Sequence, residues 1–149
     1  ITGLPAGVGG KVLQVVAATD STERSTSSTS FVTASNTLSV NITPSSTSSK
    51  IFIISTFSGG NWTGGSNSAY YTIYRDSTNL AVGNNGMASV RADGGGSGGI
   101  IPTSVSKVDT PNTTSQITYQ IYVRSDSSTV AINNRASITG TIVAMEIGA

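Results

Sequence analysis

The sequence predicts an all-β domain, an antiparallel β-sandwich of the jelly-roll kind with about eight to ten strands. Three observations predict this fold class. Short apolar or alternating segments recur along the chain and are separated by clusters of Gly, Pro, Ser, Asn and Asp, which favour turns. Residues 50–57, KIFIISTF, are apolar on both faces over a full strand length, as in a strand buried at the centre of a core. No segment keeps an apolar period of 3.6 residues, so no amphipathic helix is expected.

The chain has 149 residues, which is the size of one domain with a core of its own. Residues 1–10, ITGLPAGVGG, are rich in Gly and Pro and are predicted to be a connector from an upstream stem. Residues 11–149 are predicted to form the single β-sandwich domain. Because the chain begins with Ile1 rather than Met, we expect it to be a fragment or a processed product.

The first half of the chain contains predicted strands at residues 11–18, 30–34, 37–43 and 50–57. The segment TLSVNIT alternates apolar and polar side chains, which indicates a half-buried strand that ends at Pro44. Residues 21–30 are almost entirely Ser and Thr and are expected to form an exposed loop or edge segment. A turn is expected at Gly59-Gly60.

The second half contains predicted strands at residues 69–75, 80–82, 87–91, 100–108, 116–124, 129–133 and 137–147. The segment QITYQIYVR alternates most regularly, so its apolar positions are expected to point into the core. Pro102 has no backbone N–H, which favours a place at the edge of a sheet for its strand.

Two segments resemble each other, YTIYRDSTNLAV at residues 71–82 and IYVRSDSSTVAI at residues 121–132. Each has a Tyr-bearing strand, an Arg, an Asp-Ser turn and a short apolar return, so each is predicted to form a hairpin. The likeness either records two Greek-key halves or follows from hairpin preferences alone.

The composition excludes several classes of function. The chain has no His and no Cys, which removes disulfides, thiolate metal sites and every Ser-His or Cys-His nucleophile pair. Charged residues make up 10% of the chain and the formal net charge is +1, too balanced for a surface that binds nucleic acid. No stretch approaches the roughly 20 apolar residues of a membrane span. We therefore expect no nucleic-acid partner and no membrane insertion.

The acidic residues give no sign of acid-base catalysis or metal binding. They are scattered along the chain, mostly one per turn, at Asp20, Glu23, Asp76, Asp93, Asp109, Asp126 and Glu146. Asp in a turn usually bonds to nearby backbone, and this structural role is expected for Asp76 and Asp126. The sequence therefore predicts no cofactor, no metal ion and no enzymatic activity.

The loops that are rich in amide and aromatic side chains form the candidate binding site. Aromatic rings stack on the apolar faces of sugars, while Asn, Asp and Arg hydrogen-bond to hydroxyl groups, and loops on a rigid sandwich usually carry recognition. The candidate residues are Asn61, Trp62, Asn84, Asn85, Arg91, Asp93, Asn133, Asn134 and Arg135. The alternative is that Trp62 covers one end of the core and that the Asn residues only occupy turns.

Five stretches that follow one another along nearly the whole chain carry a resemblance to a known family. They are LPAGVGGKVLQVV, NITPSSTSSKIFI, YYTIYRDSTNLA, TSQITYQIYVRSDSSTVAINN and SITGTIVAMEI. Together they resemble the C-terminal head domains of bacteriophage tail-fibre and related virion proteins, particularly those of marine and cyanobacterial phages. The family offers no binding motif that can be transferred to this chain position by position.

The resemblance implies a β-sandwich head at the tip of a homotrimeric fibre, located in the virion and outside cells, with the stem upstream of Ile1. It also implies attachment to a glycan or protein on the host surface. In residues 69–75, Tyr71 and Ile73 share one face and Tyr70 and Tyr74 the other. If the first face fills the sandwich, the second could pack on a neighbouring subunit of the trimer.

Two other functions stay open at the level of the sequence. The same sandwich could be a purely structural virion protein, such as a capsid decoration or a collar fibre, which assembles without recognising a receptor. A glycan-processing enzyme is less favoured, because its usual carboxylate pair has no counterpart in the spacing of the acidic residues.

Overall fold

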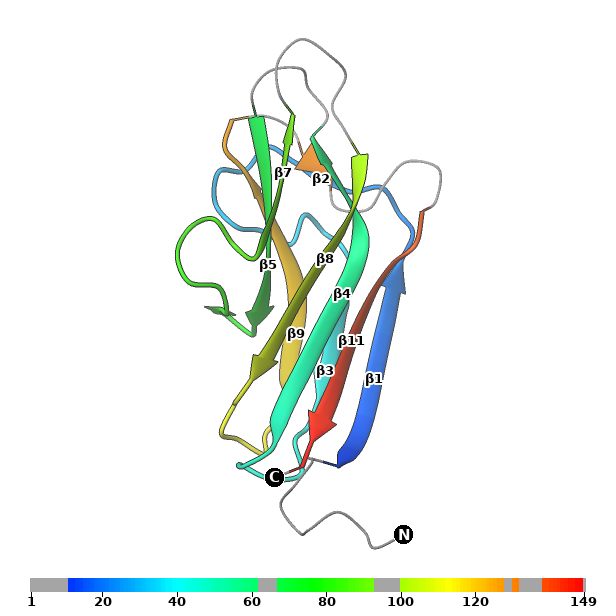
Figure 1. Ribbon diagram of the computed structural model, residues 1–149, viewed down its shortest axis with the longest axis vertical. Helices are drawn as coiled ribbons and strands as arrows, with labels where there is room; N and C mark the ends of the chain where they lie inside the picture. The colour runs from blue at the N-terminus through cyan, green and yellow to red at the C-terminus, as the bar shows by residue number, and fades with distance from the viewer. Residues whose placement is uncertain (1–10, 62–66, 93–99, 128–129, 132–137, 149) are drawn as a thin grey trace, which may run out of the picture.

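The computed structural model of the chain describes residues 11–61, 67–92, 100–127, 130–131 and 138–148. It contains two antiparallel sheets packed face to face (Figure 1), which confirms the predicted fold class. The described strands are β1 (Val12–Asp20), β2 (Ser25–Thr26), β3 (Ser39–Ile42), β4 (Lys50–Asn61), β5 (Asn67–Arg75), β6 (Thr78–Asn79), β7 (Ala88–Ala92), β8 (Ile100–Asp109), β9 (Ile117–Ser125), β10 (Val130–Ala131) and β11 (Gly140–Ile147). The described residues include no helix that is long and apolar enough to cross a membrane.

The order of the strands is that of a jelly roll. In the first sheet β1 pairs with β11, β11 with β4, and β4 with both β8 and the short strand β10, which in turn pairs with β2. In the second sheet β3 pairs with β9 and β9 with β5, which also pairs with β7 and β6. The first and last long strands are therefore neighbours, and the chain passes back and forth between the two sheets, as it does in jelly rolls.

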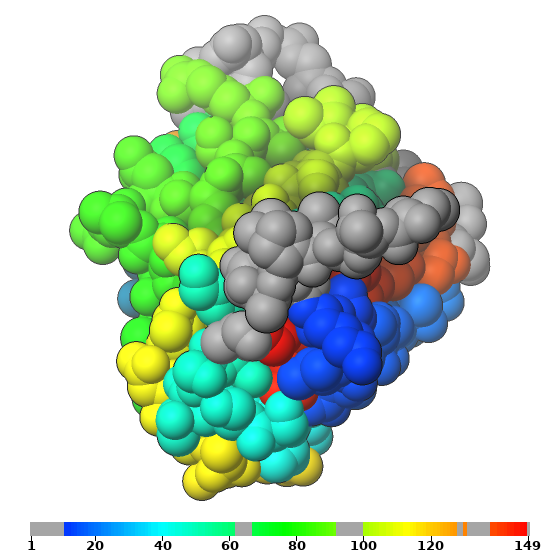
Figure 2. All heavy atoms as spheres, turned by 60° about the horizontal axis from the view of Figure 1, so that its bottom comes forward, coloured from blue at the N-terminus to red at the C-terminus, as the bar shows by residue number. Residues whose placement is uncertain are grey.

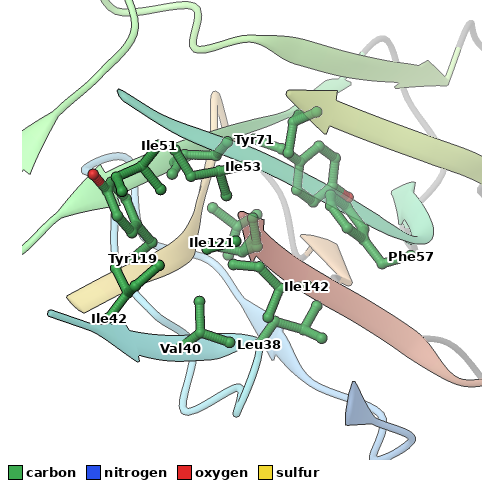
Figure 3. Close-up of a cluster of buried hydrophobic side chains, with 14 of the residues drawn as sticks. Leu38, Val40, Ile42, Ile51, Ile53, Phe57, Tyr71, Tyr119, Ile121 and Ile142 are labelled. Atoms are coloured by element: carbon green, nitrogen blue, oxygen red, sulfur yellow. The ribbon is translucent and has the colours of Figure 1, made fainter. Parts of the chain in front are cut away.

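β4 is the central strand of the first sheet, as KIFIISTF predicts. Ile51 and Ile53 are fully buried between the sheets (Figure 3). Phe52 and Ile54 are only partly buried, because they point away from the second sheet on the outer face of the first. The prediction that this strand is buried on both faces is therefore wrong for its outward face.

Tyr71 of β5 packs against the last part of β4 (Figure 3). Its ring lies 5.0 Å from that of Phe57 between centroids, and the backbone N–H of Gly60 donates a 2.9 Å hydrogen bond to its hydroxyl. A Cβ atom on Gly59 would lie 3.0 Å from the tyrosine ring. The predicted turn at Gly59-Gly60 is wrong, because β4 continues beyond these glycines, and Gly59 leaves room for the ring of Tyr71.

The rest of the core comes from alternate positions of strands in both sheets. The alternation predicted for residues 37–43 and 116–124 is confirmed, since the apolar side chains of both segments are buried. The core side chains of these segments are Leu38, Val40, Ile42, Ile117, Tyr119, Ile121 and Val123. Pro102 lies in β8, which pairs with β4 alone among the described strands and so occupies the predicted edge position.

Two predicted strands are shorter than expected. In residues 30–34 the backbone makes only an isolated bridge between Val32 and Val123. The return of the hairpin predicted for residues 71–82 is limited to β6 and stops before residues 80–82, where Val82 is 98% exposed.

The segment 121–132 is not a hairpin. The strand predicted at residues 129–133 appears in the described residues as β10, which pairs with Gly60 and Asn61 of β4 in the first sheet. The chain therefore crosses from one sheet to the other after β9. The segments 71–82 and 121–132 share a sequence pattern but differ in structure.

Glu146 of β11 is fully buried and joins three parts of the chain. Its carboxylate accepts hydrogen bonds from the backbone N–H and hydroxyl of Ser45 (2.7 and 2.6 Å), the hydroxyl of Ser49 (2.7 Å) and the side-chain amide of Gln14 (2.6 Å). Burial acts to raise the pKa of Glu146, but these hydrogen bonds favour the charged form and lower the pKa to about 2. One carboxylate thus connects β1, β11 and the turn between β3 and β4.

A second polar network connects the two sheets. Arg75 of β5 forms a 2.9 Å ion pair with Asp109 of β8, and the hydroxyl of Tyr119 of β9 donates a 2.7 Å hydrogen bond to the same carboxylate. Burial, and then the hydrogen bond to Asp109, raise the pKa of Tyr119 above its ordinary value. The phenol therefore stays neutral and acts as a donor.

Replacing Ile53 by Asp is expected to prevent folding. An unpaired charge at this fully buried position costs several kcal/mol, which is comparable with the whole free energy of unfolding. Thr78→Asp is the control, because it introduces the same charge at an exposed position on β6 in the other sheet. Thermal unfolding followed by circular dichroism compares the two, and a wild-type transition for Ile53→Asp would contradict the assigned core.

The stability of the fold is expected to fall in acid through Glu146. Because the pKa of this carboxyl in the folded state lies below its ordinary value of 4.5, its stabilising contribution is complete above about pH 4.5 and is lost as the pH falls towards 2. The full contribution is roughly 3 kcal/mol. Urea denaturation across this range should show a shallower loss for Glu146→Gln than for the wild type or for the control Glu23→Gln, which changes an exposed carboxylate.

Candidate functional site

Strand alternation gathers aromatic side chains on the outer face of the second sheet. Tyr71 and Ile73 of β5 are fully buried, as predicted, so Tyr70 and Tyr74 point outward. Residue 70 lies opposite Arg124 of β9, and two residues further Thr72 lies opposite Tyr122. Phe31, from the segment before β3, joins this group. We call Phe31, Tyr70, Tyr74, Tyr122 and Arg124 the aromatic face.

The side chains of the aromatic face contact one another. Tyr74 and Tyr122 stack with 3.9 Å between ring centroids and 15° between planes, and Phe31 lies 6.3 Å from Tyr74. The guanidinium carbon of Arg124 is 4.1 Å from the centroid of the Tyr70 ring and 5.6 Å from that of Phe31. Burial, and then the neighbouring Tyr122, raise the pKa of Tyr74. The aromatic face therefore consists of neutral rings that contact one another and of one cation, the guanidinium of Arg124.

The segment between β6 and β7 lies beside Arg124. Gly86 has a positive φ of 66°, and a Cβ atom there would collide with the carbonyl oxygen of Tyr71. The next residue, Met87, donates its backbone N–H to the same oxygen at 2.7 Å, so the segment is attached to β5. The attachment places Asn84 where its carbonyl oxygen accepts a 2.7 Å hydrogen bond from Nε of Arg124.

A groove of about 360 Å³ opens beside the aromatic face. It is lined by Thr29, Ser30, Phe31, Asn84 and Arg124, and we call it the Arg124 groove. Its hydroxyl and amide residues are exposed, whereas the ring and the guanidinium are half-buried. The groove thus combines a flat ring, polar groups that donate and accept hydrogen bonds, and one fixed positive charge, a combination that suits a small polar ligand.

The structure brings two of the predicted binding residues to this groove. Asn84 lines it, and the side-chain oxygen of Asn85 lies 3.5 Å from Nη2 of Arg124. Arg91 is exposed on β7 opposite Ser68 and is not part of the groove lining. Of the predicted loop residues that the structure describes, only Asn84 and Asn85 therefore lie at this groove.

Asn61 does not lie on an exposed loop, and its predicted role in binding stays a prediction. Asn61 is the last residue of β4 and is fully buried, because the strand continues past the glycines that were expected to end it. The other predicted residues lie outside the described residues, and they are Trp62, Asp93, Asn133, Asn134 and Arg135.

The sequence analysis missed the side chains that define the groove, namely Thr29, Ser30, Phe31 and Arg124. The alternation within β5 and β9 could have placed Tyr70 and Arg124 on outward faces. Their contact depends on the register between those two strands, which the sequence alone did not indicate.

Two acidic side chains in turns, those of Asp76 and Asp126, accept hydrogen bonds from the backbone. Oδ1 of Asp76 accepts a 3.0 Å hydrogen bond from the N–H of Thr118, and Oδ1 of Asp126 accepts a 2.9 Å hydrogen bond from that of Ser68. Burial works against the charged form of Asp126, yet hydrogen bonds from Ser68 and Ser127 lower its pKa. Both carboxylates bond to backbone N–H groups as predicted, but the donors Thr118 and Ser68 belong to distant strands rather than to the turns of these aspartates. Among the described residues no three acidic side chains gather where they could hold a metal ion.

Comparisons with known proteins give no family for the chain. No family model matches it, and no curated protein matches it. Among solved structures, the T13 viral particle of infectious bursal disease virus is similar with 16% sequence identity and a TM-score of 0.47 over 94% of this chain. The VP2 subviral particle of that virus has 13% identity and a TM-score of 0.41 over 91% of this chain. This chain spans only 36% and 40% of the lengths of those two chains.

Proposed function

We propose that the chain is a non-enzymatic attachment domain of a virion, the head of a bacteriophage fibre, which binds a glycan or a glycan-bearing protein on the host surface. The observation that carries this proposal is the Arg124 groove beside the aromatic face. A sugar ring can stack on Phe31 while its hydroxyl groups bond to Thr29, Ser30 and Asn84. The resemblance of the sequence to phage fibre heads agrees with this use of the fold.

The described acidic residues support a binding role over an enzymatic one. Glycoside hydrolysis needs two carboxyl groups that face the same bond. In the described part of the chain, Glu146 is buried at one end of the sandwich and Asp109 is paired with Arg75. Neither of them lines the groove.

Phe31→Ala is expected to weaken binding of the labelled 149-residue chain to susceptible host cells at least tenfold, because it removes the ring that would carry the sugar. Ile101→Ala on β8 is the matched control, since it removes an exposed apolar side chain of the other sheet. Thermal unfolding of both variants reports on the fold. Unchanged cell binding by Phe31→Ala, or no binding by the wild type to any susceptible host, would contradict the proposal.

We also propose that the chain forms a homotrimer through the outer face of the first sheet. Val15, Met145, Phe52 and Val108 form one apolar row across four paired strands, and Ala17, Val143 and Ile54 form the next row. Val15 and Val108 are 55% and 51% exposed. Apolar side chains that are grouped in this way on a surface indicate a protein contact. Figure 2 shows one end of this face, with β1 in blue beside β11 in red.

The low charge of this outer face favours another copy of the chain as its partner. Among the outward positions of β1, β11, β4 and β8, the only charged residue is Lys50, at the start of β4. Three copies can therefore pack this face around a three-fold axis without burying charges, as the centre of a protein interface requires. The alternative contact through Tyr70 and Tyr74, expected from the sequence, stays a prediction. It would cover the face beside the Arg124 groove, which must stay accessible if the groove is to bind a receptor.

Sedimentation at micromolar concentration is expected to give three times the 15.1 kDa mass of one chain. The double variant Val15→Glu with Val108→Glu should be folded and monomeric, because it places a charge at each end of the apolar row that forms the proposed contact. Val82→Glu is the control, since this side chain is 98% exposed outside the first sheet. A monomeric wild type, or a double variant that still forms trimers, would contradict this assignment.

A further inference from the structure

We infer that the Arg124 groove selects an acidic saccharide, one whose carboxylate or sulfate group pairs with Arg124. This inference rests on the proposed function, because it names the chemical class of the receptor that the attachment domain would bind. It depends on three features of the described residues: the fixed position of the guanidinium, the nature of its present partners, and the lining of the groove.

The guanidinium of Arg124 is held in place before any ligand arrives. Nε donates a 2.7 Å hydrogen bond to the carbonyl oxygen of Asn84, and the group lies over the ring of Tyr70 at 4.1 Å. Phe31 is on another side at 5.6 Å. A cation that is already ordered loses little conformational entropy on binding, so it suits the recognition of a single anionic group.

Among the described residues Arg124 has no carboxylate partner. Its two terminal nitrogens make only long contacts with neutral oxygens, at 3.4 Å to the carbonyl of Ser125 and at 3.5 Å to the side chain of Asn85. Asp126, the nearest acidic residue along the chain, bonds instead to the backbone N–H of Ser68. By contrast, Arg24 and Arg75 each pair with an aspartate.

A partner with negative charge would therefore improve the contacts of Arg124. A guanidinium has five N–H donors, and paired donors on one edge match the two oxygens of a carboxylate or sulfate group. Here Nη1 and Nη2 hold only weak contacts, so these donors can turn to an incoming anion. The described lining of the groove includes no acidic side chain that would repel it.

The remaining lining suits the sugar that carries the anion. The hydroxyls of Thr29 and Ser30 and the amide of Asn84 can bond to ring hydroxyl groups, and the half-buried ring of Phe31 offers a flat apolar surface. A volume of about 360 Å³ lies at the lower end of the range for ligand pockets. We therefore expect a terminal or branching sugar unit to enter the groove, with the rest of the glycan outside it.

The decisive test needs no mutation. Calorimetric titration of the 149-residue chain compares tetragalacturonate with its fully methyl-esterified form, and a sulfated galactan oligosaccharide with its desulfated form. Each pair keeps the sugar and differs in charge. We expect at least one acidic member to bind tenfold or more tightly than its neutral counterpart, with an affinity that falls as salt is added.

Variants then assign the effect to Arg124. Arg124→Gln should abolish the preference for the acidic member, and Arg124→Lys should retain part of it, because lysine keeps the charge without the paired donors. Arg24→Gln is the matched control, since it removes the same charge away from the groove. Because Arg124 also packs on Tyr70, thermal unfolding accompanies each titration.

The outcomes separate this inference from the proposed function. Equal affinity for the acidic and the neutral member of a pair would overturn the inference, but the proposed attachment function would stand, with a neutral glycan as the receptor. Host-cell binding without binding to any of the four saccharides would also overturn it. Binding of inorganic sulfate as tight as that of the sulfated saccharide would mean an adventitious ion only. Failure of the wild type to bind host cells would overturn the attachment proposal itself.

Discussion

The insertion of Tyr71 between the two sheets is the contact on which the rest of the structure depends. Its ring occupies the space left by Gly59 and packs on Phe57, while its hydroxyl accepts a hydrogen bond from the backbone N–H of Gly60 in β4. The backbone of the same residue accepts the N–H of Met87 and so fixes the segment that carries Asn84. One residue thus joins the sheets and aligns the side of the groove, so the scaffold and the candidate site cannot vary independently.

Much of the fold could be predicted because period-two alternation is a local property. The inward-facing residues can be identified from the alternation alone, without knowing the partner strands, in segments 37–43, 50–57 and 116–124. Features that depend on a distant partner could not be predicted in this way. Gly59-Gly60 has the composition of a turn, and only the contact of Gly59 with the ring of Tyr71 explains its place within a strand. Likewise, β10 follows β9 as a hairpin return would, and only its pairing with β4 shows that it belongs to the other sheet.

The candidate site shows the same division between local and non-local information. Asn84 and Asn85 could be predicted because exposed amides in a glycine-containing loop are visible in the sequence. Arg124 could not, since its environment combines Tyr70 across a strand pair with Phe31 from a segment more than ninety residues earlier in the chain. The burial of Asn61 could not be predicted either, because it depends on how far β4 continues past its glycines.

The edge position of Pro102 has a consequence for the solubility of the chain. A ten-residue strand with one side unpaired among the described strands could recruit strands from other molecules and start aggregation. Pro102 offers no N–H for such pairing, and the exposed Lys107 further along β8 adds a charge that opposes it. Uncontrolled growth of the sheet from this edge is thereby discouraged, which matters for any protein that is displayed in many copies at high local concentration.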